Sequence, residues 1–201
     1  MNFLAHLHLS GDNEQIKIGN FIGDAVKGNS YTKFAPDIQK GIILHRKIDS
    51  FTDNHAITKD LNKFFNEKYR KYSGIVVDIV YDYFLANNWQ DYSNQELEQF
   101  VSDSHSLLMN NFRILPMKIK KKLPFFIGKN RLLSYRHIDG IESVLVAMAK
   151  YTSLPQGAKF ATDIVKNEHK YFEDHFRIFY ADLYKYAKSE RENNSISLVK
   201  K

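Results

Sequence analysis

The chain of 201 residues contains no cysteine. This absence excludes disulfide bonds, thiolate zinc sites and cysteine nucleophiles. Any metal ion would therefore be held by histidine, aspartate and glutamate, a set of ligands that suits harder ions such as Mn²⁺, Mg²⁺, Fe²⁺ or Zn²⁺. The sequence also lacks a Walker loop and the patterns GxGxxG, HExxH and GxSxG, so the most familiar phosphate-binding, metalloprotease and serine-hydrolase motifs are excluded.

Long apolar runs are absent as well. No stretch reaches eighteen consecutive apolar residues, so we expect no membrane span. The N-terminal sequence MNFLAHLHLSGD has no basic region and does not resemble a signal peptide, and we expect a cytoplasmic protein. No segment alternates between apolar and polar residues for long enough to indicate a strand. We predict one all-α domain, a helical bundle of seven or eight helices over residues 1–190, followed by a polar tail at 191–201.

The charge is unequal, with 29 Lys and Arg residues against 23 Asp and Glu residues and a net charge of +6. A basic surface of no specific meaning is one interpretation, and an acidic partner is the other. Positive charge concentrates in one stretch of about twenty residues, together with aromatic residues. A solvated helix face and a docking patch both remain open for its basic residues, Lys118, Lys120, Lys121, Lys122, Lys129, Arg131 and Arg136.

The segment IQKGIILHRKIDSFTDNH, residues 38–55, combines an apolar pattern with titratable groups. At helical spacing His45 and Asp49 lie one turn apart, on the face that also carries Ile38, Ile42 and Ile48. A histidine and a carboxylate on an apolar face are costly unless each has a partner. A metal ion or a hydrogen-bonded network would serve both residues.

Two other predicted helices carry acids in apolar surroundings. In IVVDIVYDYFLANNW, Asp78 and Asp82 are one turn apart on the face expected to enter the core. Two such acids repel each other unless a cation or a donor lies between them, and bonds to Arg, Lys or backbone donors are the alternative to a metal. Asp24 lies within the apolar segment FIGDAV, so we expect it to be buried, while His6 lies on a short helix at residues 2–9.

Helices that converge with such side chains pointing inward can build a carboxylate–histidine metal centre. A metal there would lower the pKa of a water molecule and neutralise charge on a phosphoryl group. Arg46 directly follows His45 and could bind a phosphate through two hydrogen bonds. The candidates for such a centre are His6, Asp24, His45, Asp49, Asp78 and Asp82.

At these residues the chain resembles the acyl carrier protein phosphodiesterases. The matching segments are MNFLAHLHLS, GNFIGDAVKGN, GIILHRKIDSFTDNH and VDIVYDYFLANNW, in register from residue 1 to about residue 89, with a looser match in YRHIDGIESVLVAMA. The resemblance implies a divergent, all-helical branch of the HD-type metal-dependent phosphohydrolases. It also implies hydrolysis of the phosphodiester that joins 4′-phosphopantetheine to a serine of holo-acyl carrier protein, with Mn²⁺ preferred. No histidine here is followed by aspartate, so the adjacent His-Asp pair of the wider superfamily is absent, and His45 with Asp49 is the nearest substitute.

The resulting hypothesis places Mn²⁺, or another divalent ion such as Mg²⁺ or Fe²⁺, among His45, Asp24 and Asp82, with His6 or Asp49 completing the set. Water attacks phosphorus in line while Arg46 and the metal stabilise the added charge. Asp78 orients that water or accepts its proton, and His55 protonates the leaving serine.

Carrier proteins are small and acidic, so we expect one to dock on the basic stretch from Lys118 to Arg136. We expect neither nucleic acid nor a membrane as partner, and the oligomeric state stays open. Two rivals remain: a metal phosphohydrolase that acts on a nucleotide or another small phosphoester, and a helical module that binds nucleic acid without catalysis.

Overall fold

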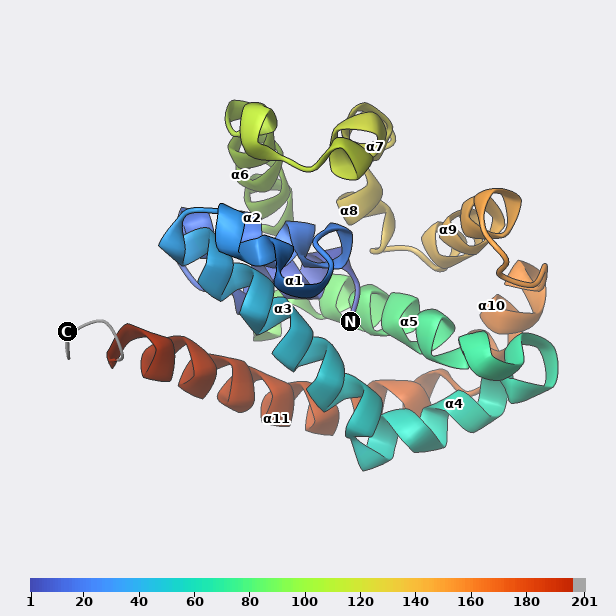
Figure 1. Ribbon diagram of the computed structural model, residues 1–201. Coiled ribbons are helices and arrows are strands. Elements are labelled where there is room, and N and C mark those ends of the chain that lie inside the picture. Colours follow the sequence, from blue (N-terminus) through green and yellow to red (C-terminus); the bar gives the residue numbers. More distant parts are fainter. Residues whose placement is uncertain (197–201) are drawn as a thin grey trace.

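The computed structural model describes residues 1–196 and confirms an all-α architecture (Figure 1). Within these residues there are eleven α-helices and no strand, with short 3₁₀ turns between several helices. The first half of the chain forms α1 (Phe3–Leu9), α2 (Glu14–Ile22), α3 (Pro36–Asn54), α4 (Ala56–Tyr69) and α5 (Ser73–Asn87). The second half forms α6 (Leu97–Asn110), α7 (Met117–Gly128), α8 (Arg131–Ser134), α9 (Ile138–Tyr151), α10 (Ala158–Asn167) and α11 (His169–Ile196).

The expected number of seven or eight helices is too low for two local reasons. The helix predicted from residue 158 to about 190 is two helices, because the backbone at Glu168 leaves the helical range at φ −107°, ψ 24°. The basic stretch after Pro116 also contains α8, a helix of only four residues. The expected tail at 191–201 begins inside α11, while residues 197–201 lie outside the described residues. The likeness to HD-type folds stays a prediction.

Helix α5 lies at the centre of the domain. Its sequence is apolar on nearly every side, which is the pattern of a helix covered all round by other helices. The long helix α11 packs against it through a row of buried aromatic rings, among them Tyr81 on Phe179 at 4.4 Å and Phe84 on Phe176 at 5.9 Å between centroids. No helix in the described part of the chain is long and apolar enough to cross a membrane.

Helices α2 and α3 make the most extensive contact between two helices in the described part of the chain. Gly19 and Gly41 face each other there, and a Cβ atom on Gly19 would overlap the carbonyl oxygen of Ile38. Only glycine permits this approach of two backbones. Helix α3 starts at Pro36, as the sequence predicts, since proline suits the first helical position. The pair α2–α3 therefore forms a tightly joined unit beneath the candidate site.

Candidate active site

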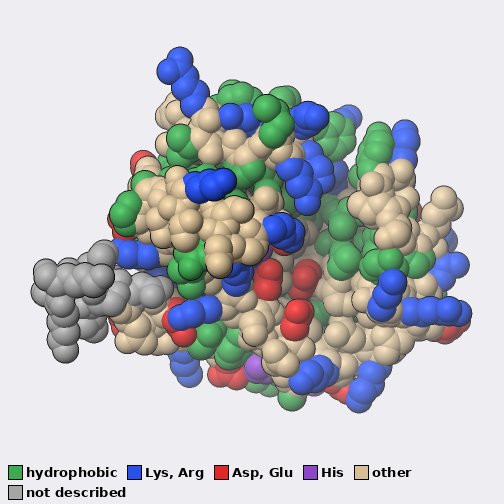
Figure 2. All heavy atoms as spheres, viewed as in Figure 1, with side chains coloured by type: hydrophobic (Ala, Val, Ile, Leu, Met, Phe, Trp, Pro, Cys, Tyr) green, Lys and Arg blue, Asp and Glu red, His purple; other side chains and the backbone are tan. Residues whose placement is uncertain are grey.

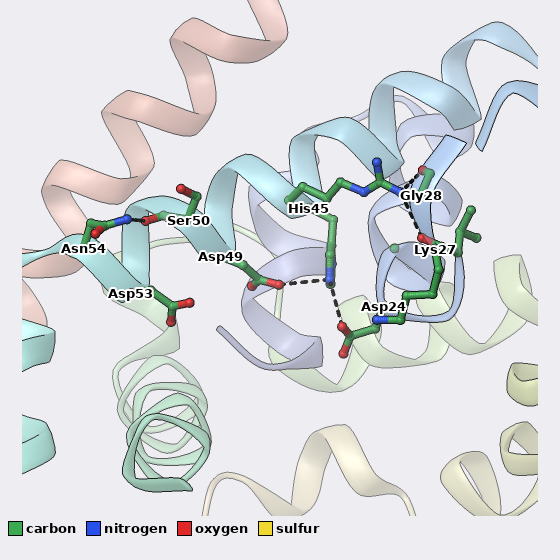
Figure 3. A pocket seen from close by; sticks show the side chains of 11 residues that line it. Asp24, Lys27, Gly28, His45, Asp49, Ser50, Asp53 and Asn54 are labelled. Carbon is green, nitrogen blue, oxygen red and sulfur yellow. Dashed lines mark hydrogen bonds and ion pairs between the residues drawn. The ribbon is translucent and has the colours of Figure 1, made fainter. Parts of the chain in front are cut away.

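A pocket of about 420 Å³ opens between α3 and the loop that follows α2 (Figure 3). The loop contains two 3₁₀ turns, η1 (Gly23–Ala25) and η2 (Gly28–Lys33). Acidic, basic and imidazole side chains meet around this pocket. Its lining residues are Gly23, Asp24, Val26, Lys27, Gly28, His45, Arg46, Asp49, Ser50, Asp53 and Asn54.

His6, His45 and Asp49 form a cluster at the inner side of the pocket. The carboxylate of Asp49 lies between the two imidazoles, with Oδ1 at 3.1 Å from His6 Nε2 and Oδ2 at 3.1 Å from His45 Nε2. The two rings stack, with 4.1 Å between their centroids. One ligand atom from each of the three residues fits within a span of 4.8 Å. The predicted pairing of His45 with Asp49 across one helical turn is confirmed, and His6 joins the pair from α1.

Asn20 fixes which nitrogen of His6 carries the proton. Its amide nitrogen donates to the backbone oxygen of His6 and to Ser10 Oγ, both at 2.9 Å. Its oxygen therefore faces His6 Nδ1 at 2.7 Å and accepts a hydrogen bond from the Nδ1–H group. Burial, with His45 nearby, lowers the pKa of His6 to about 4. A neutral His6 with its proton on Nδ1 turns the lone pair of Nε2 toward the carboxylate of Asp49.

His45 has the opposite electrostatic environment. Burial alone would lower its pKa, but the carboxylates of Asp24 and Asp49 outweigh burial and raise the pKa to about 9. The same contacts with His45 and His6 hold the pKa of Asp49 far below its usual range, against the effect of its own burial. Among the residues that the structure describes, neither ring nitrogen of His45 has a partner in hydrogen-bond geometry, although both are buried. Buried polar atoms without a partner are rare.

These observations fit a divalent cation. The lone pair of His6 Nε2 and the carboxylate of Asp49 repel each other across 3.1 Å unless positive charge lies between them. The unpartnered nitrogens of His45 border the same space. Imidazole and carboxylate together are a common ligand set for such ions. His6, His45 and Asp49 are therefore the residues that could hold one, and Asp24 lies beside them.

Asp24 is exposed, so the prediction that it is buried is wrong. Helix α2 ends at Ile22, and Asp24 lies in the 3₁₀ turn that follows, where helical spacing no longer applies. Its side chain is 72% exposed at the mouth of the pocket, with Oδ1 3.7 Å from His45 Nε2. His45 lowers its pKa against the effect of burial. Asp24 is thus an ionised carboxylate that a substrate can reach.

Asp82 does not face this cluster as a ligand. Its two carboxylate oxygens accept hydrogen bonds from the backbone N–H groups of Leu4 at 2.8 Å and Ala5 at 3.1 Å. It caps the start of α1, where carboxylates are stabilised by free amides and the helix dipole. Burial raises its pKa to about 7. This geometry corrects the prediction of Asp82 as a metal ligand. The backbone N–H groups of α1 satisfy its carboxylate in place of a metal ion.

Asp78 lies next to the cluster through the amino group of Met1. That amino group is 3.0 Å from Asp78 Oδ1 and 3.4 Å from Asp49 Oδ1. Burial raises the pKa of Asp78 to about 6, although the positive amino group opposes the change. A carboxylate with a pKa near neutrality is well placed to take up a proton, as the sequence hypothesis requires. The cation expected near the two acids of α5 is this amino group. Of those two acids, Asp78 forms an ion pair with it and Asp82 does not.

Arg46 has a structural role in addition to its place in the pocket. Its Nη2 donates to the carbonyl oxygens of Val26 at 3.0 Å and Gly28 at 2.7 Å. These bonds hold the loop that carries Lys27 against α3, so that Lys27 lies at the edge of the pocket. Sequence reasoning missed Lys27, because nothing in a lone lysine between an apolar segment and a polar loop marks it as part of a site.

His55 is placed elsewhere, and its predicted role as the acid for the leaving group is corrected. Its Nδ1 accepts the backbone N–H of Ile57 at 3.3 Å and thereby caps α4. Its Nε2 lies 3.6 Å from Asp182 of α11, and its ring packs against Phe51 and Phe179. It is not among the residues that line the pocket.

Gly23 is a second residue that the sequence did not single out for the site. The His45 ring packs directly against its backbone, and a Cβ atom on residue 23 would overlap the ring. The preference for glycine at this position comes from that packing.

An all-helical domain with histidine, aspartate and cationic side chains around one pocket has the arrangement of a phosphoester hydrolase. A sequence profile described as "Acyl carrier protein phosphodiesterase" matches residues 1–183. Curated relatives with that name include one from Yersinia pestis, 31% identical over 95% of this chain and 100% of its own length, and one from Serratia proteamaculans, 30% identical with the same coverage. One from Salmonella agona is 33% identical over 74% of this chain and 78% of its own.

The chain belongs to the acyl carrier protein phosphodiesterase family and is a phosphodiesterase hydrolase. No solved structure matched the chain.

Proposed function

We propose that the protein hydrolyses the phosphodiester between a serine of holo-acyl carrier protein and 4′-phosphopantetheine, releasing apo-carrier protein, and that it acts in the cytoplasm. The relatives' name supports the substrate. The observation that carries the chemistry is the position of His6 Nε2, 3.1 Å from the Asp49 carboxylate and beside the buried His45 nitrogens that have no partner in hydrogen-bond geometry among the described residues. We further propose that these three residues, with Asp24, hold Mn²⁺ or another divalent ion. When bound, such an ion activates water and neutralises phosphoryl charge.

Other groups, some lining the pocket and some behind its inner cluster, act on protons and on the phosphate. Asp78, with its pKa near 6, accepts a proton from the attacking water. Lys27 and the part of Arg46 not bound to the loop offer positive charge to the phosphate oxygens. Asn20 keeps His6 in one tautomer, as a partner of a metal-binding histidine commonly does. Because His6 and His45 are assigned to the ion in this proposal, Lys27 replaces His55 as our candidate for the acid that protonates the serine oxygen.

We propose that the carrier protein docks on α7 and its flanking turns. No Asp or Glu occurs between Asp103 and Asp139, whereas eight Lys and Arg residues do. Large apolar side chains are exposed on the same segment: Met109, Phe112, Ile114, Met117 and Phe125. Figure 2 shows Lys and Arg side chains over the upper part of the molecule, where α7 lies, above a group of acidic side chains on the same face. Mixed basic and apolar surfaces suit an acidic protein partner.

Two residues of the predicted docking set are already engaged. Lys120 donates to the carbonyl oxygen of Arg113 at 2.7 Å, and Arg136 pairs with Glu98. Exposed ion pairs are weak, so a partner's carboxylate can compete for Arg136. Lys118, Lys121 and Lys122 are exposed and have no carboxylate within ion-pair distance among the described residues. They are the stronger candidates.

The proposal is tested by incubating the protein with holo-acyl carrier protein and Mn²⁺ and weighing the carrier protein by mass spectrometry. Loss of the phosphopantetheine mass is the expected result. An unchanged carrier protein, together with metal-dependent hydrolysis of nucleotides or other small phosphoesters, would instead favour the small-molecule alternative.

Docking is tested separately by the salt dependence of KM. Exposed charges are screened over about 8–10 Å in ordinary buffers, so KM should rise with ionic strength. Lys121→Glu with Lys122→Glu should raise KM without changing kcat. Lys185→Glu with Lys188→Glu, the same charge change on α11, is the matched control. A KM that is unchanged by salt and unchanged in the variant Lys121→Glu with Lys122→Glu would contradict docking on α7.

A further inference from the structure

A second cavity, of about 670 Å³, lies between α9, the start of α10 and the end of α4. These elements are together at the right of Figure 1. The cavity shares no lining residue with the candidate active site. Its walls are largely apolar and come from Leu145, Val146 and Ala149 of α9 and from Ala158 and Phe160 of α10. Cavities of this size and lining are typical of small-molecule sites.

The charged groups around this cavity are mostly positive. Lys68 and Lys150 line it and have no carboxylate within ion-pair distance among the described residues, and Glu142 is the acid that lines it. A third lysine, Lys159, lies 3.4 Å from Asp163 and is partly neutralised. The cavity therefore favours an anion over a cation.

The start of α10 adds to this preference. Its N-cap, Gly157, offers no side chain to the free amides of the first turn, and that turn contains no acid. The free N–H groups and the helix dipole at such an end attract negative charge.

Tyr69 supplies an independent sign of a missing polar partner. Its side chain is fully buried, and its hydroxyl has no hydrogen-bond partner in the described part of the chain. The hydroxyl lies directly beneath Gly157, 3.2 Å from the position that a Cβ atom would take there. Burial raises the pKa of Tyr69 to about 12, so the hydroxyl keeps its proton and can donate it in a hydrogen bond. Buried hydroxyls are nearly always paired, so this one points to a ligand atom at the start of α10.

We propose that this cavity binds an aliphatic carboxylate, with its chain against Leu145, Val146 and Ala149 and its head at the start of α10 between Lys68 and Lys150. An apolar wall with cations at one end matches a molecule that is apolar along its length and negative at one end. A single negative charge suits two lysines set against Glu142. A recessed cavity between helices favours one small molecule over a flat membrane surface.

The experiment is calorimetric titration of the full-length protein with three probes. Decanoate has the chain and the negative head, decyltrimethylammonium has the same chain with a positive head, and acetate has the head alone. We expect saturable binding of one decanoate per chain and no saturable binding of the other two. Equal binding of decanoate and decyltrimethylammonium, or no binding of decanoate, would overturn the proposal.

Variants locate the binding. Ala149→Phe should fill the cavity and abolish decanoate binding, and Lys68→Ala with Lys150→Ala should weaken it about tenfold or more, since bonds to charged groups are the strong ones. Tyr69→Phe should weaken it about fivefold. Lys166→Ala, at the other end of α10, is the matched control and should bind decanoate as the wild type does. Thermal melting checks that each variant is folded. Wild-type affinity in the folded double lysine variant would refute the proposed head site even if Ala149→Phe fails to fold.

Discussion

Replacing Asp24 by asparagine separates activity from stability more cleanly than any other change in the pocket. The Asp24 side chain is 72% exposed and lies outside a regular α-helix, so its removal disturbs little packing. Its ion pair with His45 spans 3.7 Å at the solvent edge. Pairs of this kind contribute about 0–1 kcal/mol to stability. The melting temperature of Asp24→Asn should therefore stay close to that of the wild type.

Activity should respond far more strongly. Asp24 is the exposed carboxylate beside His45 at the mouth of the pocket. Losing one preorganised electrostatic contact typically costs about 10²–10³ in kcat, or about 2.7–4 kcal/mol. The assay is release of 4′-phosphopantetheine from holo-acyl carrier protein under saturating Mn²⁺. Asp37→Asn, which removes an exposed acid paired with Lys40 away from the pocket, is the control and should retain wild-type kcat. A kcat for Asp24→Asn within threefold of the wild type would refute the role of Asp24 in the site.

Three further predictions follow from the buried groups. Asp82→Asn should lower the free energy of unfolding by about 1–3 kcal/mol, because one of the two backbone donors loses its acceptor. The Mn²⁺ affinity, measured by calorimetry, should stay unchanged. A large loss of Mn²⁺ affinity would instead indicate that Asp82 is a ligand. Folding raises the pKa of His45 from 6.5 to about 9, so the protonated ring stabilises the folded protein. In protein freed of metal by EDTA, this stabilisation is fully present below pH 6.5 and is lost as the pH rises through about 9, by at most about 3 kcal/mol. Chemical denaturation at several pH values should show this slope in the wild type and not in His45→Gln. Gly23→Ala should displace the His45 ring and reduce Mn²⁺ affinity about tenfold or more, while helicity by circular dichroism is kept; unchanged affinity would show that the ring can move without harm.

The fold was predictable where a local pattern determines it. Pro36 at the first position of α3 and the apolar sequence of α5 gave the right helices, because capping and burial act within a few residues. The division of the last helical region at Glu168 was not predictable in this way. No proline or glycine marks that position, and apolar residues recur at helical spacing on both sides of it.

The site was predictable where two residues share one helix. His45 and Asp49 had to meet, because they lie one turn apart on α3. Which acids from other helices join them depends on tertiary contacts that spacing does not determine. Asp82 met the backbone of α1, and Asp78 met the amino group of Met1. Asp24 has apolar neighbours in the sequence, but it lies in a turn where its side chain is exposed to solvent.

The contact between Gly19 and Gly41 gives the pocket its width. Asp24 follows α2 by two residues, and His45 lies one turn after Gly41 on α3, so the separation of these two helices sets the distance between the two side chains. A methyl group at either glycine would press the helices apart, although neither glycine lines the pocket. The absence of a Cβ atom at both glycines thus sets the width of the pocket. Adding one carbon atom there would alter the distance between Asp24 and His45 and, through that distance, the activity.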